Sequence, residues 1–300
     1  MISRAALPFA LVLVALLLPT ACGTMPGGDL TQAALGTQSI AGIDLGAVVG
    51  VAKGVNNATR DIPVEEEIQI GHTVSASLLG AAPLDANVQQ QDYLNSVGMW
   101  LALNSERPDL PWHFGIIESE TVNAFATPGG NIFVTRGLVE RCNSEAELAG
   151  VLAHEISHVV RKHQLHDIQK NARKGVLLDV ASLKAGGLTS DAARAVARVG
   201  LEGYVRGLSR EDELEADRLG VVLAARSGYD PYGLVVVLQT LEANGSNSST
   251  AMFLKTHPSP TDRIAVLAAE MPPSFEVMAA PNPALKRYTP VFRPATKAKR

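Results

Sequence analysis

The chain is poor in cysteine and in charge: 2 of its 300 residues are cysteine and 19% are charged, whereas 46% are hydrophobic. This balance excludes an intrinsically disordered chain and is enough to form the core of one domain. The 26 basic residues are outnumbered by 30 acidic ones and form no long basic stripe. Since a nucleic-acid-binding surface needs concentrated positive charge, we expect no nucleic-acid partner.

Long apolar runs are also scarce. Residues 5–18, which follow Arg4, form an apolar run that is too short to span a bilayer and is typical of a secretory signal. We therefore expect a signal peptide over residues 1–21 and export to the periplasm. The letters LPTAC end on Cys22 and resemble a bacterial lipobox, in which the cysteine is acylated and anchors the chain to a bacterial membrane.

The lipobox departs from the usual pattern at Pro19, where leucine is common, so cleavage as an ordinary signal peptide remains the alternative. Gly23, rather than aspartate, follows the cysteine, as in lipoproteins sent to the outer membrane. If Cys22 is acylated, Cys142 is the only other thiol and no intramolecular disulfide can form. We assign Cys142 no role.

The composition divides the chain into a tether, a domain and a tail. Residues 22–60 are rich in Gly, Ala, Thr and Asn and are predicted to form the lipid anchor and a flexible tether. Residues 61–272 are expected to fold, and residues 273–300 are predicted to be an irregular basic tail. Inside the domain, the Ala- and Gly-rich segment 172–206 predicts one or two amphipathic helices or a mobile cover.

Residue patterns predict an α+β domain that is mainly α. Ser144 with Glu147 three residues later is a capping-box pattern and marks the start of one helix. Two β-rich segments, 112–119 and 131–136, are separated by PGG and predict a hairpin-like pair of strands. Hydrophobic spacing and capping residues predict helices within 61–80, 89–105, 144–163, 209–228, 231–241 and the last part of 256–271.

The segment HEISH at 154–158 carries the clearest chemical signal. Four residues advance a helix by about 400°, so His154 and His158 share a face and can bind one divalent metal ion. Glu155 lies about 100° away from His154 and is placed to act as a general base. His163 and His166 follow in a polar stretch, where we expect surface positions. Burial of the motif is suggested by its apolar neighbours Leu152, Ala153, Ile156 and Val159.

A third metal ligand is expected from the acidic segment SREDELEAD. Glu213 and Asp217 are four residues apart and therefore share a helix face. An acidic helix alone is usually a solvated surface. With a metal-binding helix upstream, we expect Glu213 to be a ligand and Asp217 to accept the N–H of a ligand histidine.

These motifs resemble the HtpX and CAAX-prenyl-protease family of zinc metallopeptidases, and more closely its secreted lipoprotein branch, which handles outer-membrane proteins. The resemblance covers about residues 60–270 and rests on four segments in the family's order and approximate spacing: VNAFATPGGNIFVTRGLV, ELAGVLAHEISHVVRKH, SREDELEAD and THPSPTDRI. It implies a zincin-like (gluzincin) domain with a small β-sheet beside the zinc-binding helix. It also implies one Zn²⁺ ion held by His154, His158 and Glu213, with Glu155 as the base.

The resemblance also implies a substrate-binding edge at Asn123, Ala124 and Phe125, where an extended peptide would add as a further strand; a simple turn is the alternative. His257 could occupy the open metal position, steady the oxyanion or be structural. Arg263 and Arg210 are further candidates for oxyanion or carboxylate contacts.

The family resemblance implies a zinc-dependent endopeptidase that acts on unfolded or misassembled envelope polypeptides. The alternative is a chaperone-like assembly factor for outer-membrane proteins with a latent or structural zinc site. Membrane-embedded members of the family carry transmembrane helices, and some secreted relatives carry a C-terminal repeat domain. The sequence shows neither, so we expect neither an inner-membrane role nor a repeat-mediated partner arm.

Overall fold

The computed structural model describes residues 39–40, 43–44, 61–179, 207–244, 250–257 and 259–278. The predicted signal peptide, the predicted lipidation site Cys22 and nearly all of the predicted tether lie outside these residues, as does most of segment 172–206. Two short antiparallel strands, β1 (Ser39–Ile40) and β2 (Ile43–Asp44), fall within the predicted tether. No described helix combines the length and the apolar character that a bilayer span requires.

The main sheet has three strands, β3 (His113–Ile117), β4 (Ala124–Thr127) and β5 (Asn131–Thr135), in the order β3-β5-β4. The predicted hairpin between residues 112–119 and 131–136 is wrong, because β3 pairs with β5 in parallel. The hairpin is instead formed by β4 and β5, which are antiparallel.

Two glycines explain this reversal of the chain. Gly129 and Gly130 have φ values of 78° and 104°, a left-handed conformation that glycine adopts without a steric penalty. They turn the chain directly after Thr127, so the four residues before the turn become the partner of β5. The strand β4 was not predicted as an element of its own.

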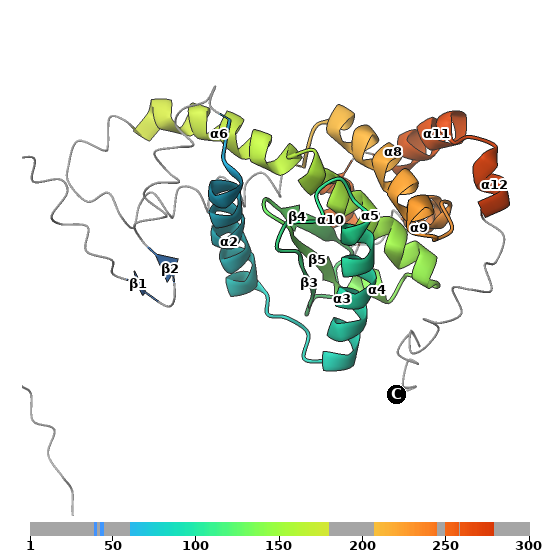
Figure 1. Ribbon diagram of the computed structural model, residues 1–300, viewed down its shortest axis with the longest axis horizontal. Helices are drawn as coiled ribbons and strands as arrows, with labels where there is room; N and C mark the ends of the chain where they lie inside the picture. The colour runs from blue at the N-terminus through green and yellow to red at the C-terminus, as the bar shows by residue number, and fades with distance from the viewer. Residues whose placement is uncertain are drawn as a thin grey trace, which may run out of the picture. The chain divides into compact units, whose positions relative to one another are not determined.

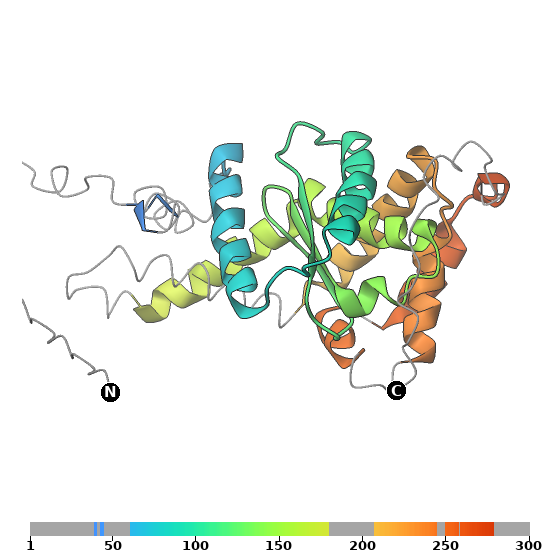
Figure 2. The same cartoon turned by 90° about the horizontal axis from the view of Figure 1, so that it is seen from below.

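Helices form most of the remaining structure (Figures 1 and 2). The six helices predicted from hydrophobic spacing and capping residues are all present. The one predicted over residues 144–163 ends at Val160, and a new helix, α6, begins at His163. The short helices α4, α10 and α12 were not predicted, and α12 lies in the segment 273–300 that was expected to be irregular. The described helices are α2 (Val64–Ala81), α3 (Val88–Leu103), α4 (Arg136–Val139), α5 (Glu145–Val160), α6 (His163–Asp179), α8 (Arg210–Arg226), α9 (Gly233–Ala243), α10 (Ala251–Thr256), α11 (Pro260–Glu270) and α12 (Ser274–Met278).

Helix α5 lies at the centre of the core. The Ser144 side chain caps it by accepting the Glu147 N–H, as the capping-box pattern predicted. On one side α5 packs against α3 and β4, and on the other against α8 and α9 (Figure 1). Every residue from Glu147 to Val159 is buried. Cys142 is also buried, which raises the pKa of its thiol to about 12, so it remains a neutral side chain at pH 7.

The two chemically important helices, α5 and α8, approach each other closely at Gly220. A Cβ atom there would lie 2.9 Å from the backbone of His154, a contact that real Cβ atoms essentially never make. A residue without a side chain therefore allows α8 to run directly against the motif. This contact brings the acidic segment of α8 to the histidines.

Side chains of α3 cover the outer edge of β3. The Gln91 amide donates to the Ile116 carbonyl and accepts the Ile116 N–H, both at 2.9 Å. The Asn95 amide makes the same pair of bonds with Phe114, at 2.8 and 3.3 Å. These bonds use backbone groups that would otherwise pair with another strand, so the β3 edge is closed to strand addition.

A buried ion pair ties α2 to the loop before the sheet. Glu67, with no exposed side-chain surface, accepts two bonds from Arg107, at 2.8 and 2.9 Å, and one from the Gly129 N–H at 3.2 Å. Arg107 also donates to the carbonyl of Val159 at the end of α5. The pair therefore connects α2, the β4–β5 turn and the motif helix.

We expect Arg107→Met to lower the free energy of unfolding by about 3 kcal/mol, because the buried Glu67 carboxylate would lose its hydrogen-bonded cation and keep only a longer ionic contact, with Lys162 at 3.8 Å. Urea denaturation measures this change. The control is Arg218→Met, which breaks an equally direct pair with Glu270 whose two side chains are 45% and 44% exposed. Exposed pairs contribute little to stability, so a comparable loss in both variants would contradict the prediction.

Candidate metal centre and active site

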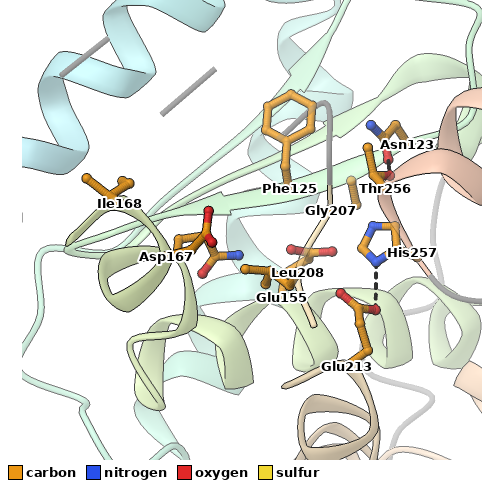
Figure 3. A pocket seen from close by; sticks show the side chains of 12 residues that line it. Asn123, Phe125, Glu155, Asp167, Ile168, Gly207, Leu208, Glu213, Thr256 and His257 are labelled. Atoms are coloured by element: carbon orange, nitrogen blue, oxygen red, sulfur yellow. Dashed lines mark hydrogen bonds and ion pairs between the residues drawn. The ribbon is translucent and has the colours of Figure 1, made fainter. Parts of the chain in front are cut away.

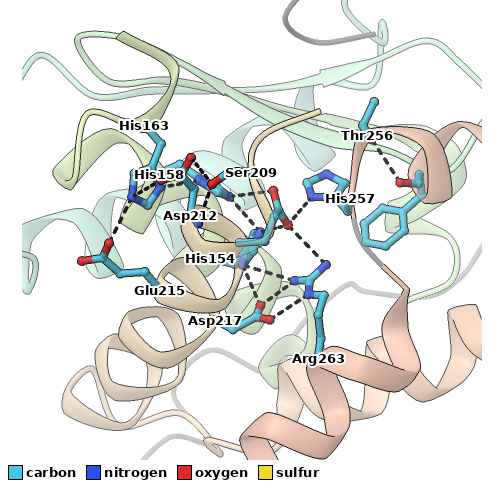
Figure 4. A network of polar contacts seen from close by, with 12 residues as sticks. His154, His158, His163, Ser209, Asp212, Glu215, Asp217, Thr256, His257 and Arg263 are labelled. Atoms are coloured by element: carbon cyan, nitrogen blue, oxygen red, sulfur yellow. Dashed lines mark hydrogen bonds and ion pairs between the residues drawn. The ribbon is translucent and has the colours of Figure 1, made fainter. Parts of the chain in front are cut away.

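Two helices bring three potential metal ligands together. Helix α5 places His154 and His158 one turn apart (Figure 4). The cap at Ser209 starts α8 so that Glu213 lies in its first turn. Their side chains are at most 3% exposed. These three residues, predicted as ligands from the sequence, form one group whose ligand atoms all lie within 4.8 Å of one another.

The distances within this group fit a metal ion. The two Nε2 atoms are 3.1 Å apart, and the Glu213 carboxylate oxygens lie 3.6 Å from His154 Nε2 and 3.5 Å from His158 Nε2. Bonds of roughly 2.0–2.2 Å in a tetrahedral zinc site place neighbouring ligand atoms about 3.3 Å apart. Glu213 Oε1 is buried and has no hydrogen-bond partner. A metal ion bound to this oxygen would satisfy it.

Asp217 supports one of the histidines from behind. Its Oδ1 lies 2.9 Å from His154 Nδ1, the contact expected from the sequence. Arg263 donates to both oxygens of Asp217, at 2.7 and 2.5 Å. Burial alone would raise the pKa of Asp217, but the buried guanidinium outweighs it and lowers that pKa. Arg210 instead pairs with Asp262 at the surface and does not contribute to this group.

His163 corrects a prediction. It was expected at the surface, but it is 5% exposed and its Nδ1 lies 2.9 Å from His158 Nδ1. Lys162 adopts a left-handed conformation with φ of 60°, so α6 is a new helix and the periodicity of α5 no longer predicts the direction of His163. Burial lowers the pKa of His163, which favours its neutral form. His166 is exposed, as predicted.

Glu155 lies in a pocket beside the metal group (Figure 3). Its side chain is 2% exposed, and burial raises the pKa of its carboxyl above the usual value because the charged form loses hydration. The predicted substrate-edge residues Asn123, Ala124 and Phe125 line the same pocket. The structure therefore brings the predicted base and the predicted edge together at one cleft. The remaining lining comes from α6, from the residues before α8, from the first turn of α8 and from the end of α10: Gln164, Asp167, Ile168, Gly207, Leu208, Glu213, Thr256 and His257.

His257 lines the pocket and contacts the ligand group. Its Nδ1 is 2.8 Å from Glu213 Oε2, and the ring of Phe253 stacks on it with centroids 4.5 Å apart. Burial would lower the pKa of His257, but Glu213 outweighs it, so that pKa is raised. Thr256 donates to the Asn123 side chain at 3.3 Å and joins this loop to the start of β4. No pattern in the sequence predicted helix α10, which carries Phe253.

A model of peptidase family M48 matches residues 88–271 of the chain. The beta-barrel assembly-enhancing protease of Escherichia coli (strain K12) is 32% identical over 220 residues, which cover 70% of this chain and 44% of that protein. The protein of the same name from Yersinia pestis is 31% identical over 253 residues, covering 81% of this chain and 49% of that protein.

A eukaryotic protein is also similar to this chain. Mitochondrial metalloendopeptidase OMA1 from Schizosaccharomyces pombe is 32% identical over 183 residues, which cover 60% of this chain and 52% of that protein. The chain thus spans about half the length of the curated relatives it matches.

Proposed function

Since this chain belongs to peptidase family M48, we propose that it is a zinc-dependent endopeptidase that hydrolyses peptide bonds of misfolded or misassembled envelope proteins. One observation carries this proposal. Two imidazole nitrogens and a carboxylate converge at tetrahedral spacing beside a pocket that contains a buried glutamate. His154, His158 and Glu213 would hold the ion, and Glu155 would act on a water molecule next to it.

Bound zinc would polarise the peptide carbonyl and make a neighbouring water more acidic. Glu155 accepts a proton from this water as its oxygen bonds to the carbonyl carbon. The same carboxyl then gives the proton to the leaving nitrogen as the C–N bond breaks. Because burial raises the pKa of Glu155, this side chain can hold the proton between the two steps. Asp217 keeps His154 oriented throughout.

The substrate would bind in extended form along β4, with Asn123, Ala124 and Phe125 aligning its backbone. Two observations support this edge. β4 is an outer strand of the described sheet and packs against α5, and these residues line the pocket that contains Glu155. The opposite edge, β3, is covered by the Gln91 and Asn95 amides.

The names of the bacterial relatives suggest a setting for this chemistry. Those proteins are described as enhancing β-barrel assembly, and we extend an envelope role to this chain. It would act in the periplasm, anchored through Cys22 to the outer membrane, with residues 61–272 as the peptidase domain. A second candidate is a chaperone-like assembly factor, which is favoured by the contact of His257 with Glu213, because this contact could keep the metal site latent.

The test is cleavage of casein, an unfolded protein, by a purified soluble form that starts after Cys22. We expect fragments from the zinc-loaded protein, none after a chelator has removed the metal, and recovery when zinc is added back. Gel electrophoresis with zinc analysis of each sample measures both quantities. Zinc-loaded protein that captures casein without cutting it would favour the assembly factor.

His257→Ala should cleave casein several-fold faster than the wild type. The reason is that His257 Nδ1 holds Glu213 Oε2 at 2.8 Å and stands beside the position where substrate would reach the metal. Initial rates at equal zinc content measure the effect. The control is Lys255→Ala, an exposed change on α10, the short helix that ends directly before His257. A slower His257→Ala would instead assign His257 to stabilising the oxyanion.

A further inference from the structure

We infer that His163 is a positioning residue of the metal site, which accepts a hydrogen bond from His158 and so fixes the ring that faces the metal. The inference rests on the proposed zinc site. His163 lies outside the HEISH motif and outside the ligand group, yet its Nδ1 is 2.9 Å from His158 Nδ1 (Figure 4). Both rings are buried, so water does not mediate this contact.

The proton positions follow from the geometry. His158 faces the ligand group with Nε2, and a nitrogen that binds a metal must offer its lone pair. The proton of a neutral His158 is therefore on Nδ1. Two N–H groups that point at each other at 2.9 Å would repel, so His163 Nδ1 must carry a lone pair and accept that proton's hydrogen bond.

The proton of His163 is then on its Nε2, and acidic residues of α8 face that atom. Nε2 lies 3.4 Å from Glu215 Oε2 and 3.7 Å from Asp212 Oδ1. The chain of contacts thus runs from His158 through His163 to the helix that carries Glu213. Each ligand histidine is supported from behind, one by the carboxylate of Asp217 and the other by a neutral imidazole.

The position of His163 is set by packing that does not depend on a metal. Leu165 and Ile168 of α6 belong to one small buried apolar cluster with Ile70 and Val74 of α2. This cluster places the start of α6 beside the end of α5. Loss of the acceptor would leave the His158 N–H buried without a partner and free the ring to turn away from the ion.

Two substitutions separate the hydrogen bond from the volume of the ring. His163→Leu keeps approximately the volume of the side chain but removes the hydrogen-bond acceptor. His163→Asn retains an acceptor oxygen at about the distance of Nδ1 from the backbone. His166→Leu, three residues along the same helix and exposed, is the matched control. Zinc affinity is measured in each purified protein by competition with a coloured chelator, and the melting temperature is measured with and without zinc.

We expect His163→Leu to raise the zinc Kd by roughly 10–100-fold, the usual effect of removing the partner of a ligand histidine. His163→Asn should recover most of the affinity, and His166→Leu should match the wild type. The increase in melting temperature on adding zinc should shrink for His163→Leu in step with its Kd.

An unchanged Kd in His163→Leu would overturn the inference, as would equal weakening by Leu and Asn. A lower melting temperature of the metal-free protein with no change in Kd would likewise show that His163 only fills space. The assay measures zinc and not cleavage, so a wild type that binds zinc but cuts nothing counts against the peptidase proposal alone.

Discussion

Glu155→Gln should reduce casein cleavage by roughly 10²–10⁴-fold, the usual contribution of a general base. Glutamine has nearly the same shape as glutamate but cannot accept the proton of the attacking water at neutral pH. Zinc should stay bound at one ion per chain, because Glu155 is not among the three converging ligands. Initial cleavage rates and metal analysis of the same samples measure the two effects.

Glu155→Asp is the matched variant, since it keeps the carboxylate but withdraws it by one methylene group. We expect it to retain a small part of the activity, because the group would still accept a proton from a less favourable position. A Glu155→Gln protein that cleaves at the wild-type rate would exclude this residue as the base. Loss of zinc from Glu155→Gln would instead show that the side chain contributes to metal binding.

The sequence predicted the two metal helices because the rules that form them are local. Ser144 and Ser209 each cap a helix by bonding to a backbone N–H three residues later. Spacing of four residues then fixes the common face of His154 and His158 wherever the helix lies in the fold. A helix cap and a shared helix face depend only on residues a few positions apart, so both can be predicted from the sequence.

Two features were missed for different reasons, and only the second depends on residues distant in sequence. β4 has only four residues, and its pairing follows from the left-handed turn at Gly129 and Gly130. The burial of His163 follows from the packing of α6 on α2, about 100 residues earlier in the chain. Neither β4 nor the position of His163 beside His158 is marked by a periodic pattern in the sequence.

Glu213→Ala should abolish zinc binding and remove the stability that zinc adds. A ligand that binds only the folded protein stabilises it by about 4 kcal/mol at a concentration 1,000 times its Kd. The wild type should therefore unfold at a higher urea concentration with zinc than with chelator. The variant should unfold at the same concentration in both solutions.

The stability of the wild type and Glu213→Ala in chelator shows what Glu213 contributes to the metal-free fold. Without metal, Glu213 is a buried carboxylate with one oxygen that has no hydrogen-bond partner, and burying such a charge is costly. His257 and Arg263 hold the pKa of Glu213 well below its usual range against the effect of burial, so the group stays charged. Glu213→Ala removes the cost of burying this charge, but it leaves a cavity in place of the side chain and deprives His257 of its partner.

Because these effects oppose each other, the stability difference between wild type and Glu213→Ala should be small in chelator and large in zinc. Asp217→Ala is the contrasting variant, since it leaves all three ligands but removes the carboxylate that supports His154 and pairs with the buried Arg263. We expect it to be destabilised by about 3 kcal/mol in chelator. In zinc the loss should be roughly 1–3 kcal/mol larger, because losing the partner of a ligand histidine weakens zinc binding roughly 10–100-fold. A Glu213→Ala protein equally destabilised with and without zinc would show that Glu213 supports the fold and not the metal.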